Sequence, residues 1–348
     1  MGDFGRFLVR RSLNTVIVLF STLILTMALL GPTMDRILLD ATKSAVIEET
    51  NYSDTKFESA VERQKFIDQR IDLQIKSIGL DEPWYSPKRF TNTILKVVAL
   101  DLGKSKFLTS ESGSANVRDI ILEKMPKTIL LFTTSTLIVT VIGLYLGAFV
   151  ANRAGSIWDK INSAFAVFSS SFPTWWVGML LIFAFAFTYH VFPARATPLT
   201  SPSDPSYPLD LFYHMLLPLM TLVLVGFGSW AYIVRYFVVG ILGEDYIIAK
   251  RTAGISQNRI LYSHALKNAA PPIITVVALS LASSFSGAIT VEAVFGWPGM
   301  GSLYYQAIGF LDIPVIIGLT YISTLIFILT VFLADTLYAF FDPRVKVS

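Results

Sequence analysis

The chain has 348 residues, of which 53% are hydrophobic and only 15% are charged, and its mean hydropathy is +0.58. This composition is too apolar for an ordinary soluble domain of that length and indicates a polytopic membrane protein. The net charge of +3 comes without a basic cluster interleaved with aromatic residues, so no nucleic acid is expected as a partner, and the absence of cysteine excludes disulfide, zinc and thiol chemistry through that residue.

Six runs are apolar enough to cross a membrane, which takes about 20 apolar residues each. They are Leu13 to Leu30, Thr128 to Val150, Ile161 to Phe187, Leu216 to Ile241, Ile273 to Val291 and Val315 to Phe341. The first run is too long for the apolar region of a signal peptide, and no small-residue cleavage site precedes Gly31 and Pro32, so we expect a retained helix. The predicted fold is all-α, with six transmembrane helices.

Lysine and arginine in the short loops predict the orientation, because both residues favour the cytoplasmic side. Those residues are Arg6, Arg10 and Arg11 before the first run, Arg153 and Lys160 after the second, Lys250, Arg251, Arg259 and Lys267 after the fourth, and Arg344 and Lys346 at the end. The alternate short loops hold little besides Arg195. Both termini and the 244–272 segment are therefore expected in the cytoplasm.

Residues 31–126 form a polar segment that is expected outside the cell, since a segment of this length crosses the membrane regardless of its charge. Apolar spacing predicts helices over Asp54–Ile78, Pro87–Leu100 and Val117–Met125. The predicted parts are 1–30, with the N-terminus and first span, 31–126, the helical insertion, and 127–348, a five-helix core. Whether the insertion docks a partner or only covers the core stays open, and the glycosylation sequon at Asn51 carries little weight.

The third run contains Pro173, which predicts a bent helix because neighbouring serine and threonine hydroxyls can bond the freed backbone carbonyl. Pro173 and Trp175 are candidates for the kink and its aromatic packing or, as the alternative, for contact with a transported molecule. The proline- and serine-rich segment 192–208 is expected to be an irregular outer connector.

Ionisable residues in spans are costly, which singles out Arg235, Glu292 and Asp335. Arg235 and Asp335 lie at similar inner depths and form a hypothetical ion pair, the alternative being that each extends separately to the membrane interface. Glu292 lies near the outer end of the fifth run, just before a glycine-rich turn with Trp297 as an interfacial anchor. A structural role for these two residues competes with one in a translocation path or gate.

The segment 244–272, between the fourth and fifth runs, is charged and helix-forming. Asp245–Ala253 contains no helix breaker, Gly254 suits the left-handed position that ends a helix, and Ser256 can cap the next one. Pro271 and Pro272 then mark the start of the fifth run. Apolar side chains on this loop predict a docking face, or packing on the protein's own inner surface: Ile247, Ile248, Ile255, Ile260 and Leu261.

At this segment the sequence resembles the EAA loop of ABC-importer permeases, specifically of the oligopeptide and dipeptide family, through Ala249, Gly254 and Leu266. Ile248 and Lys250 stand where the general pattern has Glu and Ala. The later stretches VEAVFGWPGMGSLYYQAI, LDIP and DPR, and the earlier RFLVRR and LDEPW, are similar to the same family in the same order. The resemblance therefore covers nearly the whole chain.

The resemblance implies a type I ABC-importer-like transmembrane domain in the plasma membrane of a prokaryote, in contact with membrane lipid. Its implied partners are a second related permease, two ATPase subunits that hold ATP and Mg²⁺, and an extracytoplasmic substrate-binding protein. The implied ATPase-coupling residues are Glu244, Asp245, Ile248, Ala249, Arg251, Gly254, Ile255, Arg259 and Leu266.

No cofactor, metal site or catalytic residue is expected in this chain, because it lacks a Walker A loop and because His190, His214 and His264 show no converging nucleophile. Di- or oligopeptides are the expected substrates, with oligosaccharides or metal chelates as alternatives. Two other classes, a secondary transporter and an intramembrane enzyme, would need an internal repeat with midplane charges or a catalytic constellation, and neither pattern is found in the sequence.

Overall fold

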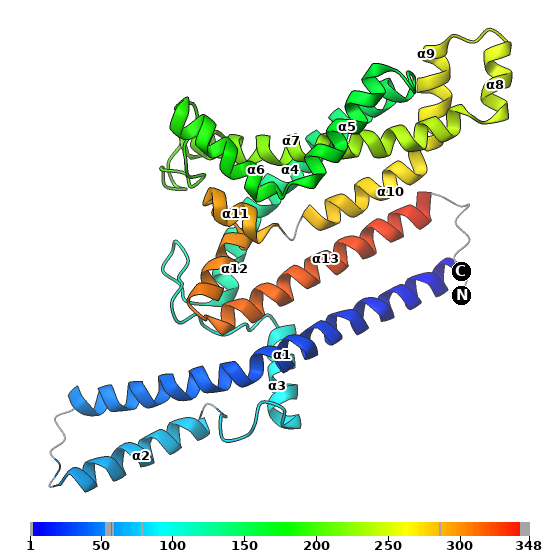
Figure 1. The fold of residues 1–348 in the computed structure, drawn as a ribbon. Coiled ribbons are helices and arrows are strands. Elements are labelled where there is room, and N and C mark those ends of the chain that lie inside the picture. The colour runs from blue at the N-terminus through cyan, green and yellow to red at the C-terminus, as the bar shows by residue number, and fades with distance from the viewer. Residues whose placement is uncertain (1–2, 53–56, 58, 78, 285–286, 342–348) are drawn as a thin grey trace. The chain divides into compact units, whose positions relative to one another are not determined.

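The computed structural model describes residues 3–52, 57, 59–77, 79–284 and 287–341. Helices form nearly all of the regular structure in these residues, with one isolated β-bridge between Lys104 and Asn116 and no strand (Figure 1). The chain packs as two units. The core unit comprises residues 1–15, 121–309 and 323–348, and the insertion unit comprises residues 16–120 and 310–322.

The helices are joined by short segments except for the two longer connections 99–116 and 189–206. They are α1 (Asp3–Tyr52), α2 (Ala60–Ser77), α3 (Pro87–Val98), α4 (Val117–Ala151), α5 (Ile157–Ser171), α6 (Thr174–Leu181), the π-helix η1 (Ile182–Thr188), α7 (Tyr207–Leu242), α8 (Asp245–Thr252), α9 (Gln257–Arg259), the π-helix η2 (Ile260–Ala265), α10 (Leu266–Ser284), α11 (Ile289–Phe295), α12 (Met300–Gly309) and α13 (Ile313–Phe341). The all-α prediction is confirmed.

By length and composition, five helical segments of the described chain can cross a membrane: Val9–Thr33, Val117–Ala151, Tyr207–Leu242, Gln257–Ser284 and Ile313–Phe332. A sixth candidate is the pair Ile157–Ser171 and Thr174–Thr188, which is bent by 95°. These segments match the six predicted runs, and the bend falls at the predicted proline. Hydroxyls of Ser170 and Ser171 bond backbone carbonyls one turn earlier, as expected for a helix interrupted by proline.

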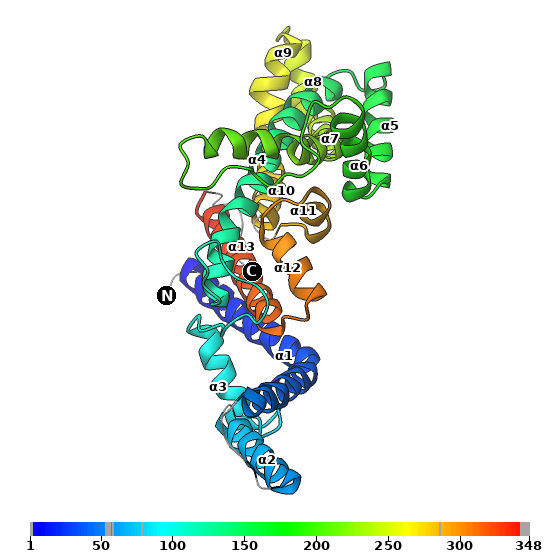
Figure 2. The same ribbon diagram turned by 90° about the vertical axis from the view of Figure 1, so that its left-hand side faces the viewer.

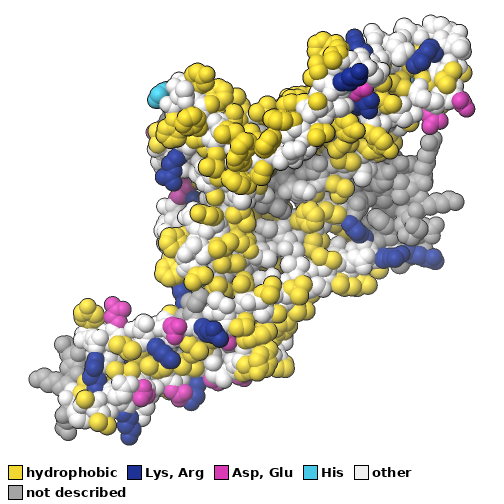
Figure 3. All heavy atoms as spheres, in the orientation of Figure 1, with side chains coloured by type: hydrophobic (Ala, Val, Ile, Leu, Met, Phe, Trp, Pro, Cys, Tyr) yellow, Lys and Arg dark blue, Asp and Glu magenta, His cyan; other side chains and the backbone are white. Residues whose placement is uncertain are grey.

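Helix α7 is the element against which α5 and α6 pack in the core unit (Figures 1 and 2). Figure 3 shows hydrophobic side chains spread over α5 and α6, while charged side chains gather at the end that carries α8 and α9. Two buried apolar clusters lie along α7. One gathers Leu131, Phe132, Met215, Leu217, Phe295 and Trp297, and the other Ala148, Trp230, Val234, Leu261, Ala265 and Ile273.

In the insertion unit, a single carboxylate fastens the loop before α4 to the start of α13. Asp312 is fully buried, and its Oδ2 accepts hydrogen bonds from the Ser105 hydroxyl at 2.6 Å and from the Lys106 and Phe107 N–H groups at 3.0 and 3.1 Å. Three donors on one oxygen make this contact the polar anchor of the loop.

The helices predicted over Asp54–Ile78 and Pro87–Leu100 correspond to α2 and α3, and the two neighbouring helices extend beyond the predicted segments. Helix α1 continues through Pro32 to Tyr52, because its later turns bury Val46 and Thr50 and this packing outweighs the proline. The helix predicted over Val117–Met125 is the first part of α4, which continues through Pro126.

Two boundaries near the fifth run also differ from expectation. The run predicted to extend to Val291 ends at Ser284, and Glu292 belongs to the separate helix α11. Pro271 and Pro272 lie inside α10 instead of at its start, because the helix after Gly254 continues through η2 into the span. A π-helical turn holds one more residue than an α-helical turn, so η2 joins α9 to α10 without an intervening loop.

Candidate functional site

The loop between α7 and α10 turns at Gly254. Its φ is +79°, the Ile255 N–H donates to the Lys250 carbonyl at 3.2 Å, and the Gly254 N–H donates to the Arg251 carbonyl at 3.1 Å. These bonds end α8 in the left-handed conformation that was predicted. Ser256 takes the N-cap position of α9 without a side-chain capping bond, so the hydroxyl cap that was expected there is absent.

Helix α8 is attached along one side to the rest of the core unit. Ile247 is fully buried, the Asn268 amide donates to the Tyr246 hydroxyl at 2.6 Å, and Lys250 Nζ lies 3.1 Å from Nδ1 of His264. These contacts join α8 to η2, which holds His264, and to α10, which holds Asn268.

The opposite side of α8 is exposed. Ile248 on this side is 48% exposed. Outside α8, Ile255 and Leu266 are half-buried, and Leu266, in α10, packs on the cluster along α7. The remaining coupling residues expected from the resemblance are all exposed: Glu244, Asp245, Ala249, Arg251, Gly254 and Arg259.

Only two of the five apolar side chains expected on the docking face are accessible at the surface. Ile247, Ile260 and Leu261 are buried within the core unit, so for these three the alternative, packing on the protein's own surface, is correct. The π-helical η2 carries Leu261 into the cluster along α7, and Ile260 beside it is fully buried. Ile248, Ile255 and the flanking charges remain as the exposed surface.

Arg235 forms an ion pair that was not anticipated. Its guanidinium donates through Nε and Nη2 to the two carboxylate oxygens of Asp159, with Nη2 at 2.6 Å from Oδ2. The side chain of Asp335, the partner proposed from the sequence, lies outside the described residues, so that pairing stays a prediction. Asp159 precedes the third apolar run by two residues and Arg235 lies near the end of the fourth run, a placement in the sequence that could have identified the pair.

Glu292 organises the turn between α11 and α12. It is fully buried, its Oε1 accepts from the Thr128 hydroxyl at 2.9 Å, and its Oε2 accepts from the Ser302 N–H at 3.1 Å. The Met300 N–H donates to the same threonine hydroxyl at 2.7 Å. Glu292 thus satisfies donors in the first turn of α12 and links that helix to α4. Although these donors favour the charged form, burial raises the pKa of Glu292, which lies outside the candidate spans, to about 7.

Trp297 is buried beside this carboxylate and is not an interfacial anchor. Its exposed fraction is 0%, and its indole N–H donates to the Lys127 carbonyl at 3.0 Å. The expectation of an interfacial position was wrong because the turn folds back on α4. Pro173 and Trp175, by contrast, are exposed at the bend between α5 and α6, with Trp175 at 37%.

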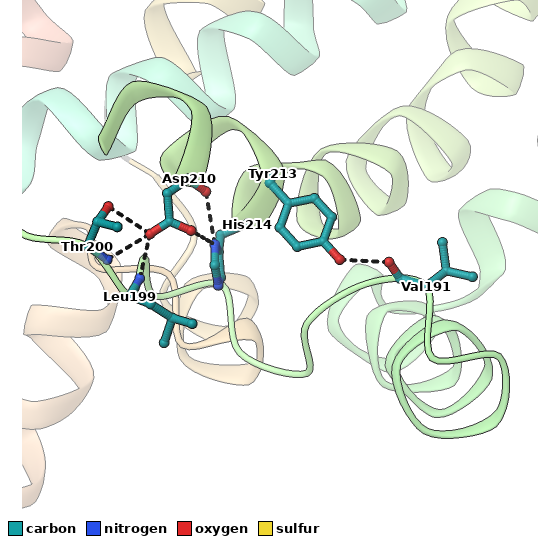
Figure 4. A network of polar contacts seen from close by, with 6 residues as sticks. All are labelled: Val191, Leu199, Thr200, Asp210, Tyr213 and His214. Atoms are coloured by element: carbon teal, nitrogen blue, oxygen red, sulfur yellow. Dashed lines mark hydrogen bonds and ion pairs between the residues drawn. The ribbon is translucent and has the colours of Figure 1, made fainter. Parts of the chain in front are cut away.

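The connector between η1 and α7 is held by Asp210 in the first turn of α7 (Figure 4). Its carboxylate accepts from the Leu199 N–H at 2.7 Å and from the N–H and hydroxyl of Thr200 at 2.8 and 2.9 Å, and Nδ1 of His214 lies 2.8 Å from its other oxygen. The Tyr213 hydroxyl donates to the Val191 carbonyl at 2.8 Å. His214 therefore belongs to a network that pins the connector.

The same connector is also fastened to α11. The Ala196 N–H donates to the Phe295 carbonyl at 2.7 Å, and the Thr197 hydroxyl donates to the Gly296 carbonyl at 2.6 Å. Within the described ranges, no group of three or more His, Asp or Glu side chains is placed to hold a metal ion.

Residues 143–347 match the family described as binding-protein-dependent transport system inner membrane component. This range is more than half of the chain. The chain belongs to that family. It is a permease subunit of an ABC importer, which agrees with the resemblance read from the 244–272 segment.

Among its relatives, the permease is 33% identical over 251 residues to the dipeptide transport system permease protein DppB of Bacillus subtilis (strain 168), covering 72% of this chain and 76% of that one. It is 28% identical over 288 residues to the oligopeptide transport system permease protein AppB of the same strain, covering 83% and 86%. A structure of the MetNI methionine ABC transporter in inward-facing conformations aligns with a TM-score of 0.44 and 18% identity, over 66% of this chain and 96% of that one.

Proposed function

We propose that the permease imports di- or oligopeptides as part of an ATP-driven complex with a second permease, two ATPase subunits and an extracytoplasmic binding protein. Support for the substrate class comes from the relatives, which are named as oligopeptide and dipeptide permeases. Oligosaccharides and metal chelates are the alternatives, and mass spectrometry of the ligand carried by the partner binding protein distinguishes the three.

The observation that carries the coupling proposal is the exposed side of α8, a short helix attached through Ile247 and bent at Gly254. The ATPase subunits, which would bind ATP and Mg²⁺, dock on Ile248 and Ile255. Four charged residues around them orient the contact and contribute less to its affinity: Glu244, Asp245, Arg251 and Arg259. Closure of the ATPases moves α8, and α7 and α10 move with it as rigid bodies.

The proposal also covers the translocation path, the parts of the chain and the orientation in the membrane. The proposed path or gate includes Pro173 and Trp175 at the exposed bend, with Glu292 and Trp297 holding its outer turn. The proposed parts are 1–30, 31–126 and 127–348, in a prokaryotic plasma membrane with both termini in the cytoplasm. A reporter fused after residue 155 or 258 is expected on the cytoplasmic side, and accessibility of residues 31–126 to protease from that side alone would contradict this orientation.

Substitution at Gly254 tests the coupling role. A Cβ there would meet no atom within 4 Å, so Gly254→Val acts through the left-handed φ alone, at a cost of about 1 to 2 kcal/mol. We expect substrate-stimulated ATP hydrolysis by the reconstituted complex to fall about five- to thirtyfold, while the spans stay folded. Gly254→Asn is the matched control, because asparagine tolerates this conformation. Equal coupling in the valine variant and the wild type would show that the bend does not transmit motion.

A further inference from the structure

The inner ends of α5 and α7 are joined by one ion pair. Asp159 is 4% exposed and receives two hydrogen bonds from the fork of Arg235, a bidentate geometry that fixes orientation as well as distance. Arg235 lies two turns before the end of α7, and α8 begins immediately after that end. The pair therefore lies close to the connection between the spans and the coupling helix.

The same carboxylate also holds the turn between α4 and α5. The Gly155 N–H donates to Asp159 Oδ2 at 2.8 Å, and Asn152 in that turn accepts a hydrogen bond from the Gln257 amide of α9 at 2.8 Å. The turn is thus linked through Asp159 to α7, which precedes the coupling loop, and is bonded directly to α9, which follows the bend at Gly254. No covalent connection joins α5 directly to either of these helices.

Apart from the ion pair, α5 and α7 meet through a close approach at small residues and through one stacked pair of rings, Phe165 of α5 and Phe227 of α7, whose centroids lie 4.9 Å apart. The Ser229 hydroxyl lies 3.5 Å from the Ala166 carbonyl, and a Cβ at Gly228 would lie 2.5 Å from the Phe165 ring. The buried residues of α5 are Asp159, Asn162, Ala166 and Ser169. Small side chains allow close approach of the two helices, and the aromatic pair adds apolar contact without a charge or a hydrogen bond between them. The ion pair adds a bidentate, charge-assisted contact to this seam, and its two parallel hydrogen bonds fix the direction of the Arg235 side chain relative to α5.

We propose that Asp159 is a positioning residue for energy coupling: through Arg235 it makes α5 and the α4–α5 turn follow α7 when the ATPases displace α8. This inference rests on the proposed function, since it presupposes that α8 is the docking helix. Without the pair, α7 would move and α5 would lag behind, so that ATP would be hydrolysed without the full rearrangement of the spans.

The test uses the reconstituted complex in proteoliposomes, with substrate transported per ATP hydrolysed as the readout. Asp159→Asn keeps the size and an acceptor for the Gly155 N–H but removes the charge. We expect its transport per ATP to fall about tenfold while the amount of assembled complex and the basal hydrolysis stay unchanged. Asp159→Glu, which restores the charge, should recover a large part of the ratio.

A second readout separates this inference from the proposed function. Hydrogen exchange of residues 151–158 is followed as the ATPase subunits are added, and protection should appear in the wild type and be absent in Asp159→Asn. Equal protection in both proteins, or a wild-type transport ratio in Asp159→Asn, would overturn the positioning role. A transport defect that merely follows a reduced amount of folded complex would overturn it as well. If the wild type itself shows no substrate-stimulated hydrolysis, the proposed function fails, and the exchange pattern still decides the role of Asp159.

Discussion

Replacing Glu292 by glutamine should remove a pH dependence from the stability of the permease. Glu292 lies in α11, is fully buried and has a pKa raised from 4.5 to about 7 by burial. Glutamine has nearly the same shape and still presents an oxygen to the first turn of α12. It has no charge to lose or gain, so it isolates the effect of ionisation.

The direction and the size of this pH dependence follow from the difference between the Glu292 pKa in the folded chain and in the unfolded chain. A raised carboxyl pKa means that the folded state holds its proton more tightly than the unfolded state. The stabilisation is therefore complete below pH 4.5, declines as the pH rises toward 7 and is lost above it. At 1.36 kcal/mol for each pH unit, the difference between 4.5 and about 7 amounts to about 3 kcal/mol.

Thermal unfolding of the purified complex, followed by tryptophan fluorescence at one scan rate from pH 5 to pH 8, measures this effect. The wild-type Tm should fall across that range, and the Tm of Glu292→Gln should stay level. Asp204→Asn is a control, because hydrogen bonds from Ser206 lower the pKa of Asp204 and confine its contribution to more acidic pH. Parallel declines in the wild type and Glu292→Gln would refute the assignment of the titration to this carboxyl group.

Three further substitutions test separate contacts. Gly299→Ala should lower the free energy of unfolding by about 2 to 3 kcal/mol, because its Cβ would lie 2.4 Å from both Glu292 Oε2 and Thr128 Oγ1. Gly309→Ala is the control: its Cβ would meet no atom within 4 Å, so the Tm should not change. Asn162→Leu should raise the stability by about 1 to 3 kcal/mol, because both polar atoms of that buried amide lack a partner among the described residues, and a lower Tm would contradict this. Asp312→Ala should expose the loop around Lys106 to trypsin, whereas Asp312→Asn, which keeps an acceptor, should preserve its resistance.

Hydropathy was sufficient to locate the spans, because each needs a long apolar run that few other structures require. It could not place helix ends where tertiary contacts decide them. Pro32 resembles a stop in the sequence, yet the turns beyond it pack well enough to continue α1 to Tyr52. The apolar run toward Val291 continues past the end of α10, because apolar composition does not distinguish one long helix from two helices that pack on each other.

The candidate site was predicted in its backbone more reliably than in its side-chain contacts. Gly254 could be identified because a left-handed position selects strongly for glycine. The direction of Ile260 and Leu261 depends on the π-helical turn η2, for which the sequence carries no clear pattern. Asp159 was missed for a related reason: a charged residue just outside an apolar run resembles an ordinary loop residue until the neighbouring helix is placed beside it.

The close fit around Glu292 constrains how this part of the chain can change over generations. With a glutamate at 292, position 299 has no room for a Cβ, and position 128 needs a hydroxyl to serve both the carboxylate and the Met300 N–H. A mutation at any one of these positions lowers stability unless another compensates, as a shorter acid at 292 would compensate for alanine at 299. Positions 128, 292 and 299, which lie far apart in the sequence, should therefore vary together among related permeases.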